Sequence, residues 1–112
     1  MASKRAEPGP KPACPRIYEA ERLTSGGVRK RREVSEAEAV ELRRRGVDVV
    51  VCGGDVATNR AVAGRIEQMA NGRWVLHRPH AHAGPQALPH FQPQTRSPGG
   101  HTFYETNKRK AR

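Results

Sequence analysis

All five histidines of the chain lie between residues 77 and 101, in a segment rich in proline and glycine. Histidine is the side chain whose charge changes near neutral pH, so a cluster of histidines indicates either proton transfer or metal binding. Proline and glycine favour irregular loops, where a folded scaffold can present reactive groups. The segment and the strand that follows it are therefore predicted to form an acid–base site.

Phosphodiester cleavage through the 2′-hydroxyl of RNA would use these residue types. It needs a base for the hydroxyl proton, an acid for the leaving oxygen and a cation near the phosphorus. The histidines at 80, 90 and 101 each stand near a proline or glycine, which suits the rim of a site. The predicted catalytic residues are His80, His90, His101, Arg96, Thr102 and Tyr104.

A second set of residues is predicted to contact the substrate: Arg78, His82, Gln92, Phe91 and Lys108. Phe91 can stack on a base or, equally, fill a core that has few aromatic residues. His77 ends an apolar run, and we interpret it as a packed residue rather than as a member of the site.

Metal binding is the main alternative for the histidines. His80 and His82 have a spacing that places two ligands on one face of an extended segment, and His90 or His101 would complete a zinc site. Magnesium fits poorly because Glu105 is the only acidic residue after His77. We predict chemistry without a metal or other cofactor, while a zinc site and a purely structural role for the histidines stay open.

The charge of the chain indicates the kind of partner. Its 112 residues carry a formal net charge of +10, which favours a polyanion, with nucleic acid first and an anionic membrane second. No apolar run is long enough to span a bilayer, so we expect no membrane span. RNA is the predicted substrate; a non-enzymatic nucleic-acid-binding module and a DNA-directed nuclease are the alternatives.

Composition divides the chain into a proline-rich leader at 1–15, a single domain at 16–105 and a basic tail at 106–112, which is expected to be frayed. The two cysteines, Cys14 and Cys52, are expected to be free thiols. Residues 16–23 have a pattern that does not decide between strand and helix. The arginine-rich run at 29–32 is either a phosphate-contacting patch or solvated charge.

The expected elements belong to an α+β fold, with one or two helices packed on a small, mainly antiparallel sheet. Ser35 and Glu38 form a capping box for a helix that ends at Gly46, with its arginines at the negative end of the helix dipole. Residues 47–52 are β-branched and apolar, which predicts a strand covered on both faces. Asp55 or Thr58 begins a second helix that runs to about Met69, and strands are expected at 73–77 and 101–105.

Several short motifs between residues 48 and 105 resemble the C-terminal effector domains of bacterial polymorphic, contact-dependent toxins. The similar segments are residues 48–53, 59–60, 66–67, 79–80, 83–85, 87–93 and 100–105. Many such domains are similar to the barnase–EndoU–colicin–RelE group of metal-independent ribonucleases, in which helices precede an antiparallel sheet that carries the site. The chain has no lysine between His77 and His101, so arginine would supply the cation.

The resemblance implies a toxin ribonuclease, with tRNA among its possible substrates. It implies His80, His90 and His101 as acid–base groups and Arg96 beside the scissile phosphate. It further implies delivery into the cytoplasm of a target bacterium as the tip of a larger secreted precursor, and neutralisation in the producing cell by an acidic immunity protein.

Overall fold

A computed structural model describes residues 14–78, 87–95, 97 and 99–112, and these residues form two helices and one six-stranded sheet. The elements are β2 (Arg16–Arg22), β3 (Val28–Val34), α1 (Glu36–Arg44), β4 (Val49–Cys52), α2 (Val56–Asn71), β5 (Trp74–His77), β6 (His90–Pro93) and β7 (Thr102–Tyr104). The strand order is β3-β2-β4-β7-β6-β5, and only the β4–β7 pair is parallel. The predicted α+β class, with helices on a mainly antiparallel sheet, is confirmed.

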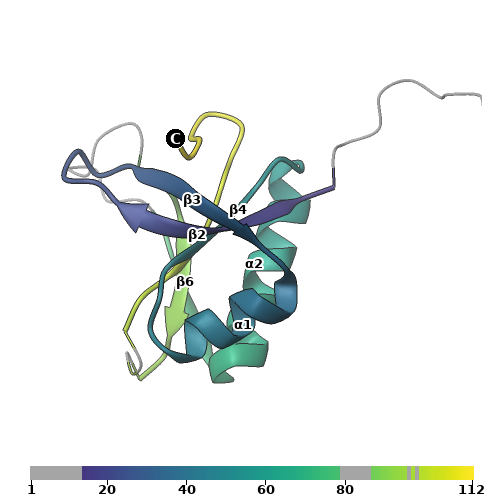
Figure 1. The fold of residues 1–112 in the computed structure, drawn as a ribbon, viewed down its shortest axis with the longest axis vertical. Coiled ribbons are helices and arrows are strands. Elements are labelled where there is room, and N and C mark those ends of the chain that lie inside the picture. The colour runs from purple at the N-terminus through teal and green to yellow at the C-terminus, as the bar shows by residue number, and fades with distance from the viewer. Residues whose placement is uncertain (1–13, 79–86, 96, 98) are drawn as a thin grey trace, which may run out of the picture.

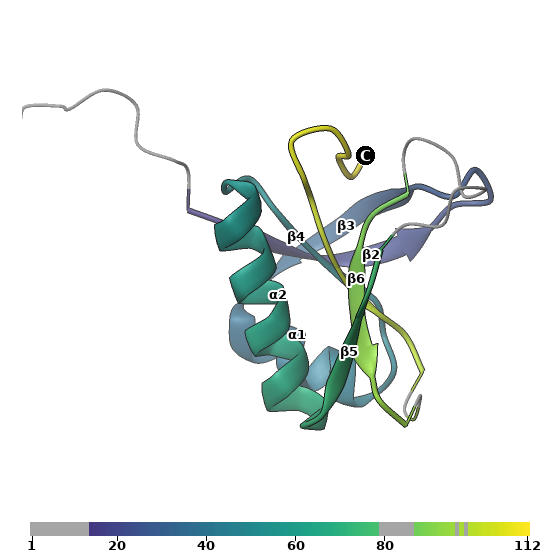
Figure 2. The ribbon, with the colours of Figure 1, turned by 180° about the vertical axis from the view of Figure 1, so that it is seen from behind.

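Both helices pack on the same face of the sheet (Figures 1 and 2). Side chains alternate across a strand, so Val49 and Val51 meet the helices while Val50 points to the opposite face. All three valines are fully buried, which confirms that this apolar run is covered on both sides. No helix of the described residues is long and apolar enough to cross a membrane.

A second, smaller core covers the sheet face that points away from the helices. Val28, Val50 and Phe103 pack there with Leu88, and Ala111 lies against them. The tail is not frayed, because the Arg112 amide donates to the Val28 carbonyl and the Arg112 carbonyl accepts from the Lys30 amide, at 2.7 and 2.6 Å. The expectation of a loose C-terminus fails because burial of an apolar side chain and edge pairing fix the backbone.

The remaining differences from expectation concern strands. Residues 16–22 form a strand, and the charged run at 29–32 lies inside β3. Strand β6 replaces part of the expected histidine loop and contains Pro93, which cannot donate a ladder hydrogen bond. Its position is tolerated because β7 pairs only with His90 and Phe91, which leaves the far end of β6 unpaired on that side.

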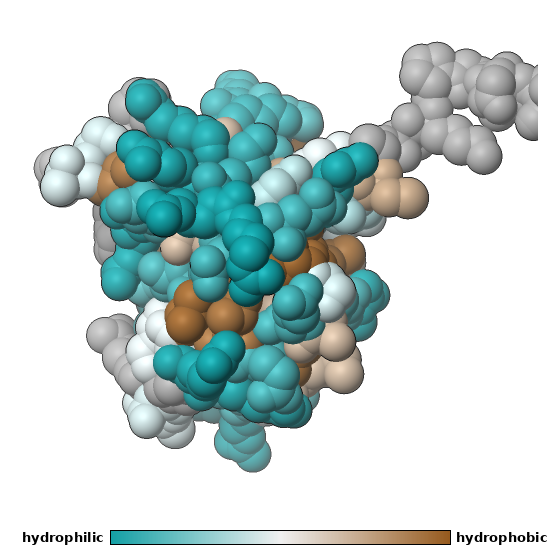
Figure 3. All heavy atoms as spheres, in the orientation of Figure 1, coloured by the Kyte–Doolittle hydropathy of each residue, from teal (hydrophilic) through white to brown (hydrophobic). Residues whose placement is uncertain are grey.

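The cations of β3 are largely neutralised by neighbouring glutamates. Glu21 lies 3.5 Å from Arg29 and 2.9 Å from Arg31, and Glu38 lies 3.4 Å from Arg32. Lys30 instead rests 5.5 Å from the centre of the Tyr18 ring. The surface over β2 and β3 is hydrophilic (Figure 3). The ion pairs show that it carries charges of both signs, which favours solvated charge over a dedicated phosphate patch.

A buried ion pair joins both helices to the sheet. Arg43 at the end of α1 and Glu67 on α2 have no exposed side-chain surface, and Arg43 Nε lies 2.9 Å from Glu67 Oε1. The Thr102 hydroxyl donates to the same carboxylate oxygen at 2.8 Å, and the Asn71 amide donates to the other at 2.6 Å. Arg43 also donates to the carbonyl of Gly99 at 3.1 Å. It is therefore a core residue rather than the surface cation at the helix terminus that the sequence predicts.

Glu67→Gln should lower the free energy of unfolding by about 3–5 kcal/mol, because Arg43 would remain buried without its counter-charge. Urea unfolding followed by circular dichroism measures the loss. Glu36→Gln is the matched control: it breaks the exposed Glu36–Arg65 pair and should cost less than about 1 kcal/mol. The double variant Arg43→Met/Glu67→Met should lose less stability than Glu67→Gln; equal losses for the buried and exposed single variants would contradict this assignment.

Candidate active site

Three histidines converge on the sheet face that points away from the helices. His77 lies on β5, His90 lies on β6 directly opposite it, and His101 immediately precedes β7. Leu76 and Phe91 point to the helix side, so the alternation of side chains places His77 and His90 on the other face. We call His77, His90 and His101 the histidine cluster.

The rings of the cluster are in contact. His90 and His101 meet edge to face with centroids 4.4 Å apart, and His77 stacks on His90 at 5.4 Å with the planes 21° apart. Phe103 lies against both His90 and His101, at 5.3 and 5.4 Å. His90 is thus the central ring, flanked by His77 on β5 and by His101 just before β7.

Asp48 holds His101 in place. Its Oδ1 accepts a 2.8 Å hydrogen bond from the His101 amide and lies 3.5 Å from Nδ1 of the His101 ring. This distance is too long for a good hydrogen bond, but it brings the carboxylate close enough to attract the ring when the ring is protonated. Oδ2 of Asp48 accepts from Arg22 at 3.0 Å. Burial raises the pKa of Asp48, but the His101 contacts and the Arg22 charge outweigh it, so the pKa lies below its ordinary value.

His90 is held in its neutral form. Burial and the neighbouring His101 and His77 lower the pKa of His90 to about 4, against weaker opposing contacts with the Leu88 backbone and the Gln92 side chain. At neutral pH this ring therefore has a nitrogen available to accept a proton. Gln92, a predicted substrate contact, is instead a neighbour of His90.

Each ring of the cluster has one buried nitrogen without a hydrogen-bond partner among the described residues: His77 Nε2, His90 Nδ1 and His101 Nδ1. Unsatisfied buried polar atoms are rare in folded proteins and often mark places where a ligand, a water or a reacting group belongs. Three of them lie on touching imidazoles, an arrangement that can transfer protons. No group of three or more described histidines, cysteines or acidic residues has an arrangement that could hold a metal ion.

The other predicted residues in β6 and β7 lie on the helix side of the sheet. Thr102 is fully buried in the Arg43–Glu67 network, so its hydroxyl does not reach a substrate, contrary to its predicted catalytic role. Phe91 is 2% exposed and packs against Trp74 and Tyr104, which makes it a core residue rather than a stacking surface. Tyr104 is 5% exposed. Side chains alternate between the two faces along a strand, so each of these three residues is only one position in sequence from a residue on the histidine face.

Arg78, Tyr104 and Lys108 nevertheless come together in one pocket of about 410 Å³, which we call the Arg78 pocket. Its other lining residues are Val56, Pro89, Thr106, Asn107 and Arg109. Burial raises the pKa of Tyr104, while the charges of Arg60 and Arg78 act in the opposite direction. Arg78 follows His77 directly, so this cationic pocket adjoins the end of β5 that carries the histidine cluster.

The predicted residues His80, His82 and Arg96 lie outside the described residues. Two members of the site were missed by sequence reasoning. His77 joins the cluster through its cross-strand partner His90, a pairing that cannot be seen before β6 is known. Asp48 had a usable signal, because an acidic residue beside an apolar buried strand needs a charged or hydrogen-bonding partner.

No family model, no curated protein and no solved structure matches this chain. The resemblance to toxin domains therefore stays a prediction. Support for a function comes from the residues of the site themselves.

His90 should titrate near pH 4 in two-dimensional NMR spectra of the imidazole protons, well below the value near 6.5 of an unperturbed histidine. Its pKa is lower in the folded chain than in the unfolded chain, so neutral His90 favours folding above about pH 6.5 and this contribution is lost as pH falls towards 4. His90→Gln should flatten the fall in unfolding free energy between these pH values. An unchanged slope, or a His90 that titrates near 6.5, would contradict the buried, neutral imidazole.

Proposed function

We propose that this chain is a metal-independent ribonuclease that cleaves RNA by histidine acid–base chemistry. The observation that carries the proposal is the placement of His101 between the Asp48 carboxylate and the neutral His90 ring, on a face where His77 completes a row of three imidazoles. A carboxylate beside an imidazole orients the ring and stabilises the imidazolium that forms during proton transfer.

The ring contacts limit how the acid and base roles can be divided among the histidines. His90 contacts His101 at 4.4 Å and His77 at 5.4 Å, so a phosphate group cannot lie between neighbouring rings of the cluster. In-line cleavage requires its acid and base on opposite sides of the phosphorus. We assign the histidine cluster to one side as a single proton-transfer unit, and the predicted His80 to the other.

The Arg78 pocket supplies the positive charge that such a reaction needs. Arg78 and Lys108 are exposed, and their side chains form no hydrogen bond or ion pair within the described part of the chain. Cations of this kind bind phosphate groups and stabilise the charge that develops during cleavage. Arg78 follows His77 directly in the chain, so an RNA strand held in the pocket on the helix side can reach the histidine cluster around the β5 edge of the sheet.

The net charge of +10 also supports an acidic protein partner. A domain that cleaves the RNA of its own cell has to be neutralised there, and an acidic immunity protein would cover the cationic surface electrostatically. Delivery into a target bacterium from a longer secreted precursor belongs to the same proposal. It is supported by the toxin-like motifs of the sequence.

Purified protein should degrade tRNA or total RNA in the presence of EDTA. Intact RNA under these conditions would remove the metal-free mechanism, and activity that returns only with zinc would support a metal site instead. Cleavage of plasmid DNA would identify a deoxyribonuclease. Binding without cleavage of either, weakening steeply with salt, would support a nucleic-acid-binding module.

His101→Gln should lower kcat by roughly a hundred- to ten-thousand-fold, because one proton-transfer group is lost. Asp48→Asn should lower kcat and change the pH profile of kcat/KM, since the ring of His101 would lose its orienting carboxylate. Glu33→Gln is the matched control, because it makes the same chemical change at an exposed carboxylate. Glu33 lies on the outer strand β3 and pairs with Arg16, so this variant should leave kcat unchanged. Unfolding curves of all three proteins separate lost chemistry from lost folding.

His80→Ala tests the group on the other side of the phosphorus. It should reduce kcat as severely as His101→Gln, whereas His77→Ala should have a small effect. If His80→Ala leaves kcat unchanged, the two-sided assignment is wrong.

A further inference from the structure

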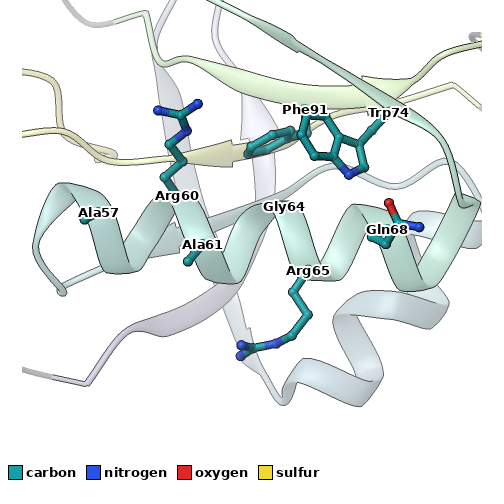
Figure 4. A pocket seen from close by; sticks show the side chains of 8 residues that line it. All are labelled: Ala57, Arg60, Ala61, Gly64, Arg65, Gln68, Trp74 and Phe91. Atoms are coloured by element: carbon teal, nitrogen blue, oxygen red, sulfur yellow. The ribbon is translucent and has the colours of Figure 1, made fainter.

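Trp74 lines a groove on the helix side of β5, the face opposite the histidine cluster (Figure 4). The groove has a volume of about 510 Å³, within the range of roughly 300–1,000 Å³ that is usual for small-molecule sites. We call it the Trp74 groove; its lining residues are Ala57, Arg60, Ala61, Gly64, Arg65, Gln68, Trp74 and Phe91.

The aromatic wall of the groove is held rigidly. Trp74 is 39% exposed, and its ring meets Phe91 edge to face with centroids 4.7 Å apart. Phe91 is itself fixed against α2, because Gly64 has no side chain: a Cβ there would lie 3.3 Å from the tip of the Phe91 ring. Ala57 and Ala61 continue the same shallow helix surface. Together these residues form a shallow apolar surface beside the exposed indole of Trp74.

The two arginines at the groove are not equivalent. Arg65 turns towards α1 (Figure 4), where it forms a two-pronged pair with Glu36 at 2.6 and 2.8 Å. Arg60 rises on the side of Phe91, and its side chain forms no hydrogen bond or ion pair within residues 14–78, 87–95, 97 and 99–112. The groove therefore combines an aromatic surface with one uncompensated cation.

Arg60 also links the groove to the Arg78 pocket. Its charge acts on Tyr104, which lines that pocket together with Arg78 and Lys108. Along this side of the sheet an apolar aromatic site is thus followed by Arg60, Arg78 and Lys108, three cations whose side chains have no partner among the residues that the structure describes. That is the pattern that single-stranded nucleic acids require, with bases on aromatic rings and phosphates on cations.

We propose that the Trp74 groove binds a nucleobase of single-stranded RNA and that Arg60 holds the neighbouring phosphate. The choice of RNA rests on the proposed function. β5 is the edge strand of the sheet among the described residues, and Trp74 and His77 lie on its opposite faces, about 10 Å apart along the strand. The RNA strand then passes from the groove, over Arg60 and the Arg78 pocket, to the histidine cluster.

Trp74 is the only tryptophan in the chain, so its fluorescence reports directly on the groove. A 2′-O-methyl RNA oligonucleotide cannot be cleaved through its 2′-oxygen and should quench this fluorescence in a saturable manner. An abasic oligonucleotide of the same length should bind more weakly and leave the fluorescence almost unchanged. Equal quenching by both would overturn the assignment of a base to the groove.

Arg60→Gln and Arg65→Gln remove the same charge from the same helix and form a matched pair. Arg60→Gln should weaken binding of a labelled 2′-O-methyl oligonucleotide roughly tenfold, whereas Arg65→Gln should change it less than about twofold. Equal weakening would indicate only general attraction to a polyanion. Quenching by polyglutamate but not by the oligonucleotide would assign the groove to an acidic protein instead.

Trp74→Leu should weaken binding roughly tenfold and Trp74→Phe less, because stacking is partly retained. On cleavable RNA, Trp74→Leu should raise KM with little change in kcat, the reverse of His101→Gln. The two proposals fail separately. Quenching without cleavage by the unaltered protein removes the ribonuclease and keeps the base site, while cleavage without quenching removes the base site alone.

Discussion

The structure depends on a charged pair that has no contact with water. Arg43 and Glu67 lie where α1, α2 and β7 meet, and taking both charges out of solvent is tolerated only because each has several partners. Arg43 reaches across to Gly99, two residues before His101. At Gly100, where φ is +90°, an added Cβ would lie 2.6 Å from the Arg43 guanidinium. The pair that joins the helices thus also fixes the entry of the chain into β7, and with it the position of His101.

A second constraint is the alternation of side chains along β5, β6 and β7. It places the histidine cluster on one face and Trp74, Phe91 and Tyr104 on the other, although all of them are close in sequence. The two faces meet at β5, because this strand forms one edge of the sheet among the described residues. A flexible polymer can contact both faces only by passing around such an edge, which is a reason to expect the proposed RNA ligand to be single-stranded rather than duplex.

Local signals were sufficient for part of the fold. The sequence predicts α1 and α2 from their caps at Ser35 and Asp55, and it predicts β4 from a short apolar run. All three elements form as predicted. β3 was missed because five of its seven residues are exposed and charged, and it is held by pairing with β2. Arg43 looked like a surface cation because nothing near it in sequence reveals Glu67. Contacts between segments that are distant in sequence, which also create the Asp48–His101 pair, cannot be predicted from local sequence patterns.

The positive charge of the chain is unevenly compensated, and this links the fold to the proposed ligand. The cations of β3 are shared among glutamates, whereas Arg60, Arg78 and Lys108 lack such partners within the described residues. A polyanion is therefore attracted most strongly to the side of the molecule that joins the Trp74 groove to the Arg78 pocket. An acidic protein inhibitor would be drawn to the same side for the same reason. Competition between substrate and inhibitor would then follow from the distribution of charge, without any change in the shape of the histidine cluster.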